Sequence, residues 1–156
     1  MAEAGAAPVR IEAVTHKHLA QWLPLRHALW SDTSRAEHAS EAAAILRTGE
    51  MTAFVALTDE AVGFAEASLR RDHVNGCEAP MGTPVAFLEG LYVVPAQRRR
   101  GIARALCAAV AQWGRSRGCL ELASDTPLGN LDSQAMHRAL GFTETERVVF
   151  FRSALK

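Results

Sequence analysis

The stretch between residues 84 and 113 constrains the fold of this chain more than any other. Its first half reads PVAFLEGLYVVP, and an apolar run between two prolines predicts a central strand with one carboxylate, Glu89, in its middle. A basic turn, RRRG, follows at 98–101, and the residues after it carry an apolar face at helical spacing: Ile102, Leu106, Ala109, Val110 and Trp113. We therefore expect a strand that leads into a helix whose first amides can bind an anion.

The rest of the chain predicts further strands and helices around this unit. Alternation predicts strands at 9–14, 51–58, 61–70, 119–124 and 143–152, with a hairpin turn at Asp59-Glu60. Helical spacing predicts helices at 15–30, kinked or split at Pro24, at 40–46, and from 130 or 132 to 141. This order predicts an α/β (α+β) fold, a mixed sheet of six or seven strands with helices on both faces. We expect one domain over residues 1–156, with residues 1–8 as a loose N-terminus.

Composition limits the function classes. Seventeen basic and seventeen acidic residues cancel, so no overall field favours nucleic acid or an anionic membrane. No apolar run approaches the roughly 20 residues of a membrane span. The three cysteines, Cys77, Cys107 and Cys119, are odd in number and lack metal-ligand spacing, which indicates reduced thiols. We expect a soluble cytoplasmic protein without a metal site.

The basic turn has features of an anion site. Gly101 allows a ligand to approach the backbone, and the small Ala103 leaves the helix surface open, which together suit a pyrophosphate. Neither the P-loop pattern nor the Gly-x-Gly-x-x-Gly dinucleotide pattern occurs. On spacing alone, the three arginines also fit a solvated charge run.

The segment RRRGIA at 98–103 resembles the Gln/Arg-x-x-Gly-x-Gly/Ala motif of the GCN5-related N-acetyltransferases. Asn130, seven residues before His137, and ALGF at 139–142 fit the same family, and the order of elements agrees over nearly the whole chain. The resemblance implies this acetyltransferase fold, with acetyl-coenzyme A as co-substrate and no metal. It assigns coenzyme A binding to Leu91, Val93, Arg98, Arg99, Arg100, Gly101, Ile102, Ala103, Asn130 and Ser133.

Four segments give a narrower resemblance, to aminoglycoside 6'-N-acetyltransferases: HVNGCE at 73–78, FLEG at 87–90, ASDT at 123–126 and GFTETERV at 141–148. This implies direct acetyl transfer to the 6'-amine of an aminoglycoside antibiotic in a ternary complex, as a resistance enzyme, and a homodimer formed partly through the C-terminal strands. It places the aminoglycoside at Trp30, His73, Glu89, Asp125 and Glu146. Core packing for Trp30, helix capping for Asp125 and a solvated position for Glu146 are the structural alternatives.

Glu89 is the candidate catalytic base. It is predicted to share a strand face with Phe87, Leu91 and Val93 and to be partly desolvated there. The resemblance implies that it binds the reactive ammonium and accepts its proton, and Gly90 beside it permits a β-bulge. The other interpretation of Glu89 is a carboxylate paired with a neighbouring arginine.

His137 departs from the family pattern. Many members have a tyrosine there, which protonates the leaving thiolate, and a histidine can also act as an acid. Because coenzyme A can also leave as a thiolate, the identity of the general acid stays open. Two other functions also stay open: transfer to another small amine, such as a polyamine or metabolite, and a coenzyme A-binding module without catalysis.

Overall fold

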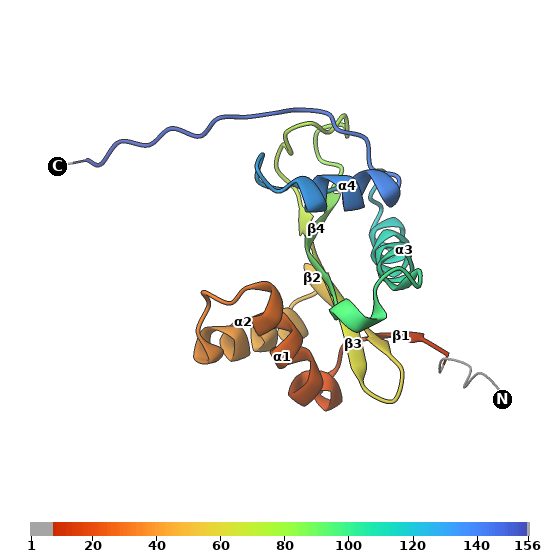
Figure 1. The fold of residues 1–156 in the computed structure, drawn as a ribbon. Coiled ribbons are helices and arrows are strands. Elements are labelled where there is room, and N and C mark those ends of the chain that lie inside the picture. Colours follow the sequence, from red (N-terminus) through yellow and green to blue (C-terminus); the bar gives the residue numbers. More distant parts are fainter. Residues whose placement is uncertain (1–7, 156) are drawn as a thin grey trace.

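The computed structural model describes residues 8–155, and the expected loose N-terminus lies, except for Pro8, outside them. Five strands form one sheet in the order β1-β2-β3-β4-β5 (Figure 1). The first four pair antiparallel and β5 pairs parallel with β4, so the predicted mixed sheet is confirmed. The strands are β1 (Arg10–Ala13), β2 (Met51–Leu57), β3 (Ala61–Arg70), β4 (Val85–Val93) and β5 (Leu122–Ala123).

Helices cover both faces of the sheet, as predicted (Figure 1). On one face, α1 (Leu19–Leu29) and α2 (Arg35–Arg47) enclose a core with β2 and β3, and on the other α3 (Ile102–Ser116) packs across β2, β3 and β4. The last helix, α4 (Leu131–Ala139), follows β5. Short 3₁₀ turns, His16–His18 and Pro95–Gln97, precede α1 and α3.

Strand β3 separates two kinds of side chain onto the two faces, because successive residues of a strand point to opposite sides. Ala65 and Ala67 lie in the core cluster that α3 closes. Glu66, Ser68 and Arg70 therefore share the opposite face, which α1 and α2 cover only in part (Figure 1). Exposure rises along this row, from the buried Glu66 to the exposed Arg70.

The two N-terminal helices differ from the sequence prediction. Helix α1 continues through Pro24 and is not split, since its apolar side is anchored by the buried Trp22 and Leu25. Helix α2 begins at Arg35, not at residue 40. Ser34 starts it earlier because its hydroxyl accepts from the Glu37 amide at 3.2 Å while the Glu37 carboxylate accepts from the Ser34 amide at 2.9 Å.

The strand expected at 143–152 is absent from the described structure, so the prediction of six or seven strands was wrong. The chain after α4 runs extended away from the body (Figure 1). Its alternating apolar residues pair with no strand among residues 8–155, and Val149, Phe150 and Phe151 are 77%, 88% and 93% exposed. Strand β5 is also shorter than the expected 119–124, with two residues in the ladder.

Candidate active site at the β4 bulge

The centre of the candidate site is a β-bulge in β4. Glu66 pairs with Gly90 and Ala67 pairs with Leu88, so Glu89 is an extra residue without a cross-strand partner. The structure thus confirms the predicted bulge. It also corrects the predicted strand face: the extra residue shifts the alternation, so Leu91 and Val93 pack toward α3 while the Glu89 carboxylate lies on the opposite face.

The Glu89 carboxylate is held by two residues of β3. The Ser68 hydroxyl donates to Oε1, and Nη2 of Arg70 lies 3.2 Å from Oε1 and 3.3 Å from Oε2. The Arg70 guanidinium in turn lies over the Phe87 ring, 3.3 Å from its centroid. With 31% of its side chain exposed, Glu89 is more accessible than the sequence suggested, and it has the arginine partner of the alternative interpretation.

Trp30 borders the bulge at the end of α1. A Cβ atom on Gly90 would collide with the Trp30 indole and approach Leu29 Cδ2 to 3.2 Å, so the glycine makes room for this ring. The indole also packs against Phe64, with ring centroids 5.7 Å apart. Trp30 is half-buried, so it belongs to the core and adjoins the candidate site.

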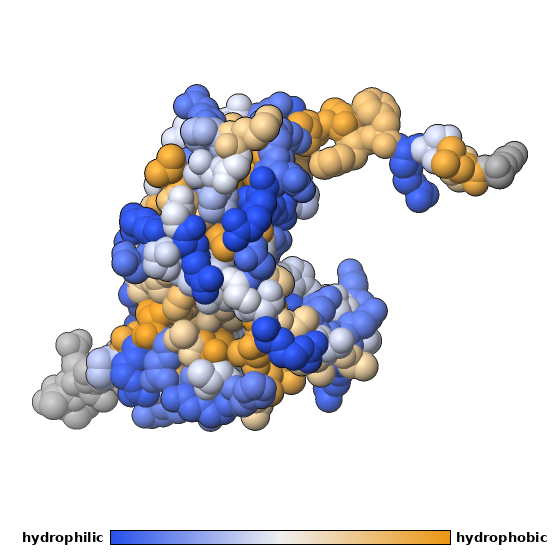
Figure 2. Space-filling view, turned by 180° about the vertical axis from the view of Figure 1, so that it is seen from behind, coloured by the Kyte–Doolittle hydropathy of each residue, from blue (hydrophilic) through white to orange (hydrophobic). Residues whose placement is uncertain are grey.

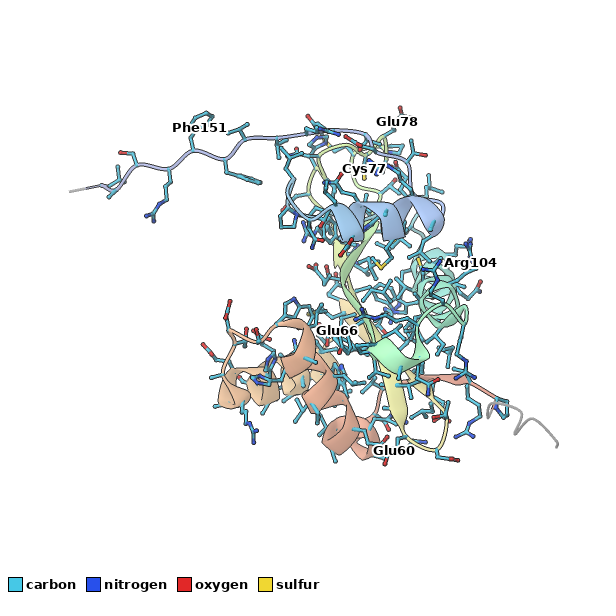
Figure 3. All side chains as sticks on the ribbon, in the orientation of Figure 1. Glu60, Glu66, Cys77, Glu78, Arg104 and Phe151 are labelled. Carbon is cyan, nitrogen blue, oxygen red and sulfur yellow. The ribbon has the colours of Figure 1, made fainter. Side chains whose placement is uncertain are left out.

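A buried ion pair lies beneath Trp30, and the sequence analysis did not identify it. Arg26 Nε lies 2.6 Å from Glu66 Oε1 and Nη2 lies 3.2 Å from Oε2. Burial raises the pKa of Glu66, and the Arg26 guanidinium opposes that shift. The guanidinium carbon also lies 5.0 Å from the centroid of the Trp30 ring. Figure 3 shows Glu66 pointing from the sheet toward α1. The only sequence signal was a carboxylate between two alanines, Ala65 and Ala67, in the predicted strand.

Strand β4 loses its partner on one side next to the bulge. Its pairing with β5 is limited to Ala86 with Leu122 and Phe87 with Ala123. Ser124 extends the contact by one hydrogen bond, at 3.3 Å, to the Leu88 carbonyl. Within residues 8–155, no strand adjoins the far side of the following stretch, which contains Leu91 and Val93. Apart from the Val93 carbonyl, which accepts from Arg98, the backbone groups on this side are available to an extended ligand.

The turn before α3 leaves space for an anion. Gly101 is the N-cap with φ 77°, and a Cβ there would meet nothing within 4 Å. Arg98 folds back, with Nε donating to the Val93 carbonyl at 2.8 Å, and Arg100 donates to the Gln97 side chain. These two guanidiniums therefore stabilise the turn, and all three arginines, Arg99 included, are exposed. The Ile102 side chain lies in the core and Ala103 is half-buried, so Ile102 has only its backbone to offer a ligand.

Helix α4 brings His137 to the end of β5. Asn130 caps the helix by accepting from the Ser133 amide at 3.1 Å, as one of the two predicted caps. His137 Nδ1 lies 2.7 Å from the Ser133 carbonyl, which can only accept, so Nδ1 carries the hydrogen in this contact. Its Nε2 lies 2.8 Å from the Ser124 hydroxyl. Ser124 was not singled out from the sequence, although it lies in the ASDT segment.

The remaining predicted substrate residues lie in loops. Ala123 of β5 pairs with Phe87 of β4. The exposed Asp125 lies two residues beyond Ala123, and Glu89 lies two residues beyond Phe87, so both acids follow the same end of the parallel pair. Glu146 is exposed and lies near Gly76, where an added Cβ atom would be 3.7 Å from the Glu146 Cβ. His73 lines a pocket of about 380 Å³ with residues of 71–85. Among residues 8–155, no hydrogen bond joins Asp125, Glu146 or His73 to Glu89.

Other chemical features of the described chain are few. Cys77, Cys107 and Cys119 are free thiols. No group of three or more His, Cys, Asp or Glu residues within 8–155 is arranged to hold a metal ion. The helices of that range are all too short or too polar to cross a membrane.

Comparison with known proteins identifies the family. Residues 14–142 match the model of the acetyltransferase (GNAT) family. An aminoglycoside N(6')-acetyltransferase type 1 from Serratia marcescens is 52% identical over 142 residues, which cover 90% of this chain and 95% of that protein. Its counterpart from Salmonella typhimurium is 46% identical over 143 residues, with 91% and 97% covered.

Two solved structures agree. AAC(6')-Iy in complex with the bisubstrate analogue CoA-S-monomethyl-acetylneamine superposes with a TM-score of 0.90 at 44% identity, over 96% of this chain and all of that one. AAC(6')-Ih from Acinetobacter baumannii gives a TM-score of 0.89 at 40% identity, over 96% and 100%. The chain belongs to the acetyltransferase (GNAT) family.

Proposed function

We propose that this protein transfers the acetyl group of acetyl-coenzyme A directly to the 6'-amine of aminoglycoside antibiotics. The observation that carries the proposal is the accessible Glu89 carboxylate, placed by the bulge where β4 begins to expose its backbone edge. An amine that arrives protonated cannot attack a thioester. Glu89 binds the ammonium and accepts its proton, directly or through water. The relatives named for this activity and the bisubstrate complex support the choice of substrates.

Coenzyme A fits the open side of β4 and the start of α3. The free edge at Leu91 and Val93 bonds the pantetheine arm, and the first amides of α3 bind the pyrophosphate beside Gly101. Arg99 is exposed next to this turn and adds positive charge. The turn is shaped by Arg98, Arg100, Ile102 and Ala103. The start of α4 is formed by Asn130 and Ser133. Acetyl-coenzyme A supplies the activated acyl group.

The aminoglycoside is held by separated acids. A substrate with several ammonium groups needs several carboxylates, since each charge-assisted hydrogen bond fixes one amine. Asp125 and Glu146, both exposed, bind ammonium groups other than the one at Glu89. Trp30, beside Gly90, and His73, in the pocket of residues 71–85, add aromatic surface for the drug. Acetylation of the 6'-amine removes a positive charge from the drug, which is the basis of resistance.

His137 takes part in proton transfer to the departing thiolate. Its Nδ1 is fixed by the Ser133 carbonyl, so Nε2 is the nitrogen that exchanges a proton, and the atom in contact with it is the Ser124 hydroxyl. Ser124 also reaches the Leu88 carbonyl, one residue from Glu89. The pair thus links α4 to the strand that carries the candidate base.

A matched pair of drugs tests the proposal. Neomycin and paromomycin differ in bearing an amine or a hydroxyl at the 6' position, so release of free coenzyme A thiol with neomycin and not with paromomycin is expected. Glu89→Gln should lower turnover while leaving acetyl-coenzyme A affinity nearly unchanged. A preference for spermidine over neomycin would instead support a polyamine or metabolite acetyltransferase. Tight acetyl-coenzyme A binding without thiol release on any amine would support a non-catalytic module.

The protein acts as a homodimer in the cytoplasm. The free cysteines are compatible with a reducing compartment. The C-terminal segment projects from the body with its apolar side chains exposed (Figure 2), and a second copy would cover them. We expect light scattering to give twice the monomer mass for the wild type. The double variant Val149→Asp/Phe151→Asp should be monomeric, and a monomeric wild type would contradict the dimer.

A further inference from the structure

Two polar side chains of the β3 row contact the candidate base directly. Ser68 and Arg70 are two residues apart on one face, and both contact Glu89 across the β3–β4 pair. The neighbouring Arg71, by contrast, is paired with Glu50 through contacts of 2.9 and 3.0 Å. Two donors of β3 therefore converge on the candidate catalytic carboxylate, and the adjacent arginine does not.

We propose that Ser68 and Arg70 are positioning residues that hold the Glu89 carboxylate in the orientation in which it receives the substrate ammonium. This inference depends on the role of Glu89 proposed above. Because Glu89 is the extra residue of the bulge, no residue opposite it in the ladder fixes its side chain. A glutamate has several rotatable bonds, and contacts beyond the backbone are needed to order it.

The two donors are themselves anchored. Ser68 lies directly opposite Phe87 and Arg70 opposite Val85, so the register of the two strands sets their positions. The Arg70 guanidinium lies 3.3 Å from the centroid of the Phe87 ring, which limits its movement. Glu89 is thus held from a rigid part of the sheet.

The contacts leave room for a substrate. A carboxylate has about four lone-pair directions, and Ser68 and Arg70 use those that face β3. The Glu89 side chain is still 31% exposed, so further acceptor positions point to solvent. An incoming ammonium can bond there without displacing either donor. If Arg70 instead occupied the ammonium position, its removal would tighten substrate binding, which is the opposite outcome.

Steady-state kinetics with neomycin and acetyl-coenzyme A test the inference in four variants. Ser68→Ala and Arg70→Gln should each raise the KM for neomycin about tenfold, the scale of a lost hydrogen bond to a charged group, with the KM for acetyl-coenzyme A within about twofold of wild type. Ser68→Thr keeps the hydroxyl and should restore wild-type values. Glu50→Gln weakens the neighbouring ion pair with Arg71 from a residue outside the candidate site and should change neither KM.

A double-mutant cycle separates positioning from a general structural effect. In a Glu89→Ala background, Ser68→Ala should add less than about a twofold change, since the side-chain oxygen that accepts from the Ser68 hydroxyl is gone. Calorimetric binding of neomycin to the coenzyme A complex provides a second readout that does not require turnover, and it should weaken in parallel with KM.

The outcomes are distinguishable. An unchanged KM in Ser68→Ala, a lower KM in Arg70→Gln, or a full Ser68→Ala effect in the Glu89→Ala background overturns the positioning role alone, provided that Glu89→Gln is impaired. An unimpaired Glu89→Gln enzyme, or a wild type that neither binds nor acetylates neomycin, overturns both the proposed role of Glu89 and this inference.

Discussion

Removing the buried carboxylate of Glu66 should destabilise the fold strongly. Glu66 is 2% exposed and Arg26 is 3% exposed, and two hydrogen bonds of 2.6 and 3.2 Å join them. Glu66→Ala leaves the guanidinium charge in the core. Its remaining acceptors are the His38 carbonyl and the His38 Nδ1, each at 3.1 Å, and the Glu41 carboxylate at 2.9 Å.

The magnitude follows from this incomplete compensation. Breaking a buried pair by removing one partner costs about 3–5 kcal/mol, and we expect the lower end because Glu41 still balances part of the charge. Glu41 is a weak substitute, since 55% of its side chain is exposed to water. At roughly 2–4 °C per kcal/mol for a chain of this size, the melting temperature should fall by about 6–12 °C.

Urea unfolding followed by tryptophan fluorescence and circular dichroism measures this loss. Trp22 and Trp30 both lie near Arg26, so fluorescence reports on the same region. Glu50→Ala is the matched control, because it removes an exposed pair with Arg71 and should cost less than about 1 kcal/mol. A Glu66→Ala cost no larger than that of the control would refute the reasoning.

Two further predictions concern single sites. Gly90→Ala should cost about 1–3 kcal/mol of the free energy of unfolding and raise the KM for neomycin, because the new methyl group collides with the Trp30 indole. Gly129→Ala, where a Cβ meets nothing within 4 Å, should be silent in both measurements. Burial raises the pKa of both the Cys77 and the Cys107 thiols, but Cys107 is buried while Cys77 is half-exposed. Native iodoacetamide labelling read by mass spectrometry should therefore modify Cys77 well before Cys107, and equal rates would contradict this.

Local sequence signals predicted the part of the fold that holds the site. The apolar run before the basic turn gave β4, the glycine turn gave the start of α3, and a glycine next to an acid in an apolar strand indicated the bulge. These features depend on residues close together in the chain. Glycine at position 101 is required by its positive φ, which a side chain would strain.

The wrong predictions for the last strand and for the start of α2 have one physical cause. Each element depends on a hydrogen-bond partner that the apolar pattern of the sequence does not show. The apolar alternation at 143–152 satisfies the pattern of a strand, yet a strand forms only where another strand offers hydrogen bonds, and the described part of the chain offers none there. The early start of α2 depends on the reciprocal bonds between Ser34 and Glu37, which a search for apolar spacing overlooks.

The same limit applies to the site. Ser68 and Arg70 precede Glu89 by 21 and 19 residues. The strands that carry them, β3 and β4, could pair in several registers. Alternation places Ser68 and Arg70 on one face of β3, but only the observed register places that face opposite Glu89. The pair of Ser124 and His137 depends likewise on how α4 packs at the end of β5.

The bulge explains why these separate features meet at one place. Without the extra residue, Leu91 and Val93 would share a face with Glu89, and either the acid would be buried against α3 or the two apolar side chains would be exposed. With it, both apolar residues enter the core while Glu89 and Gly90 lie on the face of Trp30, Ser68 and Arg70. The packing that fixes the β3–β4 register therefore also orients the candidate base. A substitution that shifts the register, even far from Glu89, should cost activity before it unfolds the sheet.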